Sequence, residues 1–172
     1  MRIDRKKIEQ HNERGLAKHT QRFSYLQSEL GNLDGIIAKL AAFQVAIPSW
    51  ALGTGGTRFG RFPGPGEPGS LEQKLDDVGL LHALNQSSGA ISLHIPWDIP
   101  KDYSAIRKQA AELNLKFDAV NSNTFQDQPG QAHTYKFGSL QNVNKATRKQ
   151  AIDHNIEVIK HGVELGSESL TV

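Results

Sequence analysis

The sequence predicts an α/β fold built on a parallel sheet, because strand-like and helix-like segments alternate along most of the chain. Short apolar runs of strand length cover residues 44–49, 90–95, 116–121 and 168–172. Segments with helical spacing separate them. Such alternation favours parallel strands joined by right-handed helical crossovers. Both an open doubly wound sheet and part of a (β/α)8 barrel satisfy this pattern.

The helices between the strands are predicted from caps and from apolar spacing. Ser70 is an N-cap residue, and Gln73 completes a capping box with it. The apolar residues that follow at helical spacing are Leu71, Leu75, Val78, Leu81 and Leu84. A second helix is expected around Ile106, Ala110 and Leu113. Asn144 caps a third helix that ends near Gly166, and its expected buried stripe is Ile152, Ile156, Ile159 and Val163.

The first forty residues carry many helix formers, and they predict an N-terminal helical extension over residues 1–43. The sheet-forming part then covers residues 44–172. Four strands cannot close a barrel, and the fourth predicted strand lies at the end of the chain without a covering helix. We therefore expect residues 44–172 to be the first half of a truncated domain.

The composition excludes several classes of protein. The 172 residues include 20 Lys and Arg against 18 Asp and Glu, so the net charge is +2, and no basic stripe suggests a nucleic-acid partner. The absence of cysteine excludes disulfides and thiolate metal sites. No apolar run approaches the roughly 20 residues needed to span a membrane. A cytoplasmic location is the expectation.

The segment from Gly53 to Gly69 holds seven of the chain's 16 glycines and three prolines. A phosphate-binding loop fits poorly, because such motifs need a helix to open at the glycines, whereas here the next helix is predicted near Ser70. A lid loop over a site fits better, with Gly53, Gly55, Gly56, Arg58 and Phe62 as its residues. A plain flexible connection is the alternative.

Aromatic side chains near this loop suggest a surface on which a sugar could stack. Trp50 ends the first strand, and Phe59 lies inside the loop. Exposed aromatic side chains on a loop are unfavourable unless they cover something. Packing against the rim of the sheet explains them equally well.

His94 is the strongest candidate for polar chemistry. It lies at the carboxyl end of the second predicted strand, which is where active sites of barrels form. A neutral imidazole can donate to and accept from a sugar hydroxyl. Trp97 and Asp98 follow in the next loop and are placed to orient it.

Polar residues also follow the third strand, in Asn121 to Phe125 and in the loop with Gln131, His133 and Tyr135. They suit either a pocket rim or ordinary turn chemistry, and for Phe125 pocket lining is favoured. By contrast, His154, Glu157 and His161 fall opposite the predicted apolar stripe of their helix. They are expected on its solvated outer face.

Four long segments together resemble the L-rhamnose isomerases, especially the pseudomonad-type branch. They are IPSWALGTGGTRFGRFPGPGEP, SLHIPWD, FDAVNSNTFQDQPGQAHTYKFGSL and ATRKQAIDHNIE. The resemblance covers residues 43–172. It implies a xylose-isomerase-like (β/α)8 barrel that interconverts an aldose and a ketose, with two manganese-like divalent metals per site and a homotetrameric assembly.

The resemblance also assigns roles to residues of this chain. Trp50 and Phe59 match apolar substrate walls, Phe125 matches a further pocket aromatic, and His94 matches a histidine that hydrogen-bonds the sugar. The metal ligands and principal acid–base groups of these enzymes come from later strands, so this chain is expected to hold no metal and to isomerise nothing alone. A non-catalytic sugar-binding module and, less favoured, a nucleotide-binding domain are the alternatives.

Overall fold

The computed structural model describes residues 4–52 and 64–172. Within these ranges β1 (Ala46–Pro48), β2 (Ala90–Ile95), β3 (Lys116–Ser122) and β4 (Leu170–Thr171) form one sheet in the order β1-β2-β3-β4. Every neighbouring pair is parallel. Strands of a barrel follow one another in this sequential order, whereas a doubly wound sheet reverses its order at a switch point. The α/β prediction is confirmed, and the topology is that of a partial barrel.

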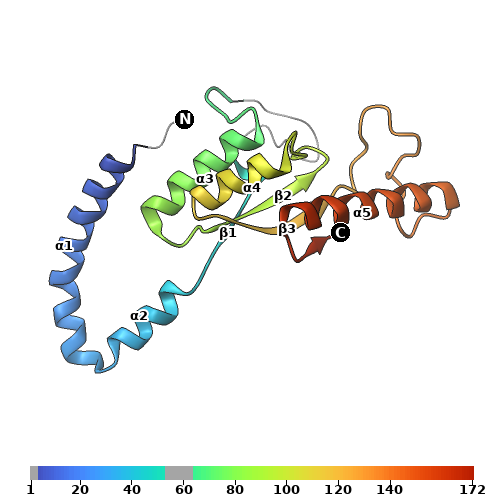
Figure 1. The fold of residues 1–172 in the computed structure, drawn as a ribbon. Coiled ribbons are helices and arrows are strands. Elements are labelled where there is room, and N and C mark those ends of the chain that lie inside the picture. Colours follow the sequence, from blue (N-terminus) through green and yellow to red (C-terminus); the bar gives the residue numbers. More distant parts are fainter. Residues whose placement is uncertain (1–3, 53–63) are drawn as a thin grey trace.

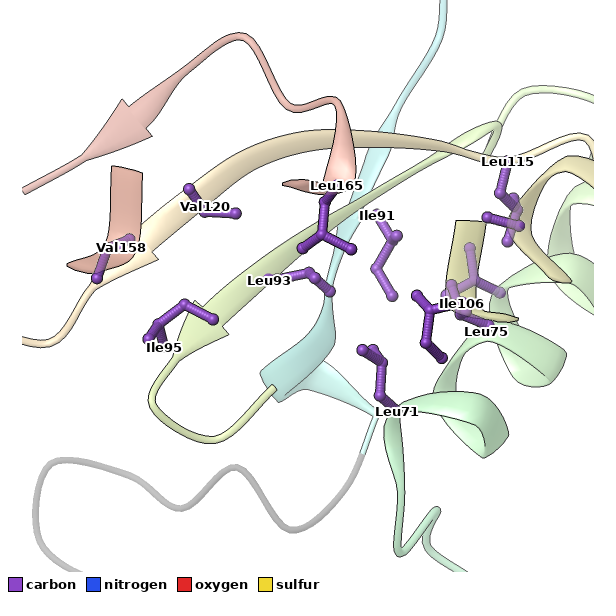
Figure 2. Close-up of a cluster of buried hydrophobic side chains, with 12 residues drawn as sticks. Leu71, Leu75, Ile91, Leu93, Ile95, Ile106, Leu115, Val120, Val158 and Leu165 are labelled. Carbon is purple, nitrogen blue, oxygen red and sulfur yellow. The ribbon is translucent and has the colours of Figure 1, made fainter. Parts of the chain in front are cut away.

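Helices cover one face of this sheet, as Figure 1 shows for α3 (Leu71–Asn85) and α4 (Tyr103–Glu112). The side chains of Ile91, Leu93 and Ile95 on β2 are fully buried on that face. Figure 2 shows them among core residues of the helices and of neighbouring strands. Because successive strand residues point to opposite faces, Ser92 and His94 project away from the helices.

The start of α3 follows the sequence prediction closely. The Oγ atom of Ser70 accepts a hydrogen bond from the Gln73 amide at 3.3 Å, and the Gln73 side chain accepts one from the Gly69 amide at 2.7 Å. The helix therefore begins well beyond Gly56 in the sequence, which argues against a phosphate loop. Its apolar stripe is buried at Leu71, Leu75 and Val78, whereas Leu81 and Leu84 are partly exposed.

The orientation predicted for α5 (Lys145–Leu165) is wrong. The predicted stripe is substantially exposed, with Ile152, Ile156 and Ile159 each about half exposed and Val163 more so. Small residues face the sheet instead: Ala151 is fully buried, and a Cβ atom on Gly162 would lie 3.0 Å from Cγ2 of Val120. Close helix–sheet approach through small side chains thus decides the orientation.

In the observed orientation of α5, the histidines that were expected in solvent are largely buried. The His154 and His161 side chains are only 17% and 16% exposed. The phenol of Tyr103 on α4 hydrogen-bonds to Nδ1 of His161, joining the two helices. Glu157 lies between the histidines and remains more than half exposed.

The N-terminal helices α1 (Arg5–Leu30) and α2 (Leu33–Ala41) form an arm that extends away from the sheet (Figure 1). The first turns of α1 attach to the domain through Ile8, which is buried, and through Asn12, whose Nδ2 donates to the Ala83 carbonyl at 2.9 Å. The rest of the arm is largely exposed. Among the helices described, none combines the length and apolar character needed to cross a membrane.

Candidate functional site

Three aromatic side chains surround the imidazole of His94. Its ring centroid lies 5.3 Å from that of Trp50, 4.5 Å from that of Trp97 and 5.6 Å from that of Phe125. The two tryptophans meet the imidazole at steep interplanar angles of 66° and 75°. We call these four residues, Trp50, His94, Trp97 and Phe125, the His94 cluster.

Three members of the His94 cluster are brought together by the parallel topology. Trp50 lies in the short 3-10 turn Ser49–Ala51 directly after β1, His94 lies near the carboxyl end of β2, and Phe125 follows β3. Carboxyl ends of parallel strands meet at one edge of the sheet, which is the edge that carries active sites in barrels. Trp50 is 40% exposed and Phe125 is 51% exposed, so a ligand can reach both rings.

A buried carboxylate fixes the backbone beneath this cluster. Asp98 is 2% exposed, and its Oδ1 accepts a hydrogen bond from Nζ of Lys74 at 2.7 Å. Its Oδ2 accepts from the backbone amide of His94 at 2.8 Å and from the hydroxyl of Ser49. Asp98 therefore ties the end of β1, the end of β2 and the first turns of α3 together.

The environment keeps His94 neutral. Its pKa is lowered to about 4, mainly by burial and to a lesser extent by the nearby positive charges of His154 and Lys74, while the Asp98 carboxylate acts in the opposite direction. Its Nε2 atom is buried and has no hydrogen-bond partner within the described part of the chain. A neutral imidazole with an unpartnered nitrogen is suited to a polar ligand atom, because an unmade buried hydrogen bond is costly.

The structure brings together four of the residues singled out from sequence: Trp50, His94, Trp97 and Phe125. Phe59 and the proposed lid residues Gly53, Gly55, Gly56, Arg58 and Phe62 lie outside the described residues. Sequence reasoning missed Lys74. The available signal was its spacing, since a lysine at position 74 falls inside the stripe that runs from Leu71 to Val78.

A divalent metal does not fit the described residues by themselves. Across residues 4–52 and 64–172, no group of three or more His, Asp or Glu side chains is arranged to hold an ion. His154 and His161 each contact the Glu157 carboxylate, at 3.5 and 3.7 Å, and do not form such a group. No step of a reaction can be assigned to a metal held by these side chains.

The fold and the His94 cluster thus define a barrel-type α/β protein with an aromatic, histidine-containing cluster at the carboxyl edge of its sheet. No protein-family model matches the chain. It is 55% identical over 141 residues to a protein of Rhizobium meliloti (strain 1021) named a probable sugar isomerase. It is 50% identical over 140 residues to a protein of Mesorhizobium japonicum that carries the same description.

These similarities cover 82% and 81% of this chain but 33% and 32% of the two relatives. The chain therefore spans about a third of the length of the curated relatives it matches. The segment is similar to part of two probable sugar isomerases.

Proposed function

We propose that this chain supplies one wall of the substrate pocket of an aldose–ketose isomerase. The observation that carries the proposal is the clustering of Trp50, Phe125 and the neutral His94 at the carboxyl edge of the sheet. The names of the two relatives support the sugar isomerase class.

The chemistry of the His94 cluster suits a monosaccharide. A sugar offers C–H faces that pack against aromatic rings, together with hydroxyl groups that both donate and accept hydrogen bonds. The neutral imidazole bonds one hydroxyl at low cost, because no ion has to be desolvated. Asp98 holds the strand ends so that the rings keep their spacing.

The finer proposals come from the resemblance to the L-rhamnose isomerases. The substrate would be L-rhamnose and related aldoses, and the full-length enzyme would be a cytoplasmic homotetramer. Two manganese-like ions would polarise the sugar oxygens and would be held by residues beyond those described here. Phe59 and the lid residues would close over the sugar.

Sugar binding can be measured directly, because Trp50 and Trp97 are the chain's two tryptophans and both belong to the His94 cluster. Titration with L-rhamnose should change the intrinsic fluorescence of the chain. His94→Ala should weaken this response at least tenfold, because it removes the polar contact. His19→Ala, on the exposed part of α1, is the matched control and should leave the titration unchanged.

A chimera tests the assignment to an isomerase. The aligned region of the Rhizobium meliloti protein is replaced by the matching 141 residues of this chain, and ketose formation from L-rhamnose and other aldoses is measured with added Mn²⁺. The chimera should isomerise the sugars that the relative isomerises. An active relative and a correctly folded but inactive chimera would contradict the proposal.

A non-catalytic sugar-binding module is the second candidate. It is favoured by the aromatic cluster occurring without a metal-binding group in the described part of the chain. Sugar binding by the chain together with an inactive chimera is the result that would select it.

A further inference from the structure

The buried carboxylate of Asp98 receives three hydrogen bonds, and each donor belongs to a different element of the fold. Nζ of Lys74 on α3 donates to Oδ1 at 2.7 Å. The hydroxyl of Ser49 and the backbone amide of His94 both donate to Oδ2, the amide at 2.8 Å. Asp98 itself lies in the turn after β2. One side chain therefore joins segments that are up to 49 residues apart in the sequence.

The same carboxylate lies within one residue of both tryptophans of the His94 cluster. Ser49 directly precedes Trp50 in the turn that follows β1. Asp98 directly follows Trp97, and the amides of these two residues donate to the His94 carbonyl, each at 3.0 Å. The position of the carboxylate thus sets the spacing of the two indoles, whose ring centroids lie 5.3 and 4.5 Å from that of the imidazole.

The set of donors requires Asp98 to be ionised. A backbone amide and an ammonium can only donate, whereas both oxygens of a carboxylate accept. A protonated carboxyl would turn its own O–H towards one of these donors. An anion that is only 2% exposed needs a cation beside it, because an uncompensated buried charge is costly. Lys74, which is itself 6% exposed, supplies that cation.

Lys74 also opposes the protonation of His94 by this anion. The pKa of His94 is lowered mainly by burial; the Asp98 carboxylate acts against this shift, and the Lys74 ammonium acts with it. The carboxylate can therefore fix the backbone of His94 while the imidazole stays neutral. A neutral ring keeps an acceptor as well as a donor for a sugar hydroxyl.

We propose that Lys74 is a positioning residue of the sugar site and acts on the His94 cluster through Asp98. Its ammonium maintains the anion that the ends of β1 and β2 share. This role rests on the proposed function, because it requires a sugar at the cluster. It goes beyond stability, since buried ion pairs can often be replaced without loss of the fold. Sugar affinity should then depend on Lys74 separately from its effect on unfolding.

The test measures sugar affinity and ring geometry separately in the full 172-residue chain. Affinity for L-rhamnose is followed by tryptophan fluorescence. Ring geometry is followed without sugar, at neutral pH, by NMR of the His94 ring protons and of the indole N–H groups of Trp50 and Trp97, because aromatic neighbours shift these signals. Lys74→Met should weaken L-rhamnose binding about tenfold and move all three sets of signals.

Two controls separate positioning from stability. Lys149→Met removes a lysine whose ion pair with Asp153 is exposed, and it should leave both measurements unchanged. Leu115→Ala truncates a buried side chain directly before β3, at the opposite edge of the sheet from the His94 cluster. It should destabilise the chain about as strongly as Lys74→Met but leave the affinity unchanged. An equal loss of affinity in Leu115→Ala would overturn the role, because affinity would then follow stability alone.

A double variant tests whether Lys74 acts through Asp98. In Lys74→Met/Asp98→Asn, the amide oxygen at position 98 can still accept from Ser49 and His94, and no buried charge is left alone. This variant should recover most of the L-rhamnose affinity that Lys74→Met loses. A double variant that binds no better than Lys74→Met would overturn the route through Asp98.

Ser49→Ala tests the same network without leaving a charge unpaired, so it decides the question even where Lys74→Met does not fold. It should move the Trp50 and His94 signals more than the Trp97 signal and weaken L-rhamnose binding severalfold. Unmoved ring signals in Ser49→Ala, or an unchanged affinity in folded Lys74→Met, would overturn the role. Absence of any L-rhamnose response in the unmodified chain would instead contradict the proposed function, while the ring signals still report whether Lys74 spaces the cluster.

Discussion

The ammonium of Lys74 and the carboxylate of Asp98 lie 2.7 Å apart, with their side chains only 8% and 1% exposed. A buried ion pair is weak evidence for net stability, but breaking one partner is costly because the other charge stays uncompensated. This asymmetry makes the pair a sensitive point beneath the His94 cluster.

Lys74→Met should lower the free energy of unfolding by about 3 kcal/mol, because it leaves the Asp98 carboxylate buried without its cation. Urea denaturation followed by circular dichroism measures this change. The matched control is Lys149→Met, which removes the exposed pair with Asp153 and should cost less than about 1 kcal/mol. Equal losses of unfolding free energy in the two variants would mean that burial of the Lys74–Asp98 pair does not increase the cost of breaking it.

His94 should titrate with a midpoint near pH 4, in contrast to 6.5 for an unperturbed histidine. Its folded-state pKa is depressed, so the unfolded chain binds more protons between these two values. Its contribution to stability is therefore fully present above pH 6.5 and is lost as the pH falls toward 4.

The titration of the His94 ring signals by NMR measures that midpoint. In a companion measurement, His94→Gln should lose less stability than the unmodified chain between pH 6.5 and 4. A midpoint at or above 6.5 would show that the imidazole is not desolvated.

Gly162→Leu should destabilise the chain by about 1–3 kcal/mol through overpacking. The physical reason is the short distance of 3.0 Å between a Cβ atom at this position and Cγ2 of Val120. Gly15→Ala is the control, since nothing lies within 4 Å of a Cβ atom there. It should be neutral or stabilise α1 by up to about 1 kcal/mol. Thermal unfolding of both variants provides the comparison.

The observed orientation of α5 predicts that alanine substitutions at two of its apolar residues destabilise the chain by different amounts. Val158→Ala should cost about 1.5 kcal/mol or more, because Val158 is fully buried. Ile156→Ala should cost less than about 1 kcal/mol, since Ile156 is 47% exposed. Denaturant midpoints of the two variants test the helix orientation. A larger loss of stability for Ile156→Ala than for Val158→Ala would support the orientation expected from the apolar stripe.

Much of the fold could be predicted because its signals are local. The caps at Ser70 and Asn144 and the strand-length runs before Pro48 and Pro96 each act over a few residues. The convergence of Trp50, His94 and Phe125 could also be predicted from the sequence, since parallel strands place their carboxyl ends at one edge of the sheet.

The sequence-based predictions failed where contacts between residues far apart in the sequence determine the structure. The isoleucines of α5 form the more apolar stripe, yet Gly162 and Ala151 allow the closer approach to β3. Periodicity measures hydrophobicity along one helix and carries no information about the shape of its partner. The Lys74–Asp98 pair was missed for the same reason, because its members are far apart in sequence.

The arm formed by α1 has a consequence for the hydrodynamic size of the chain. Its 26 helical residues extend about 39 Å at 1.5 Å per residue. A compact protein of 172 residues has a radius of gyration of about 16 Å. Small-angle X-ray scattering from the monomer should therefore give a larger radius and an asymmetric distance distribution, and size-exclusion chromatography alone would overstate its mass.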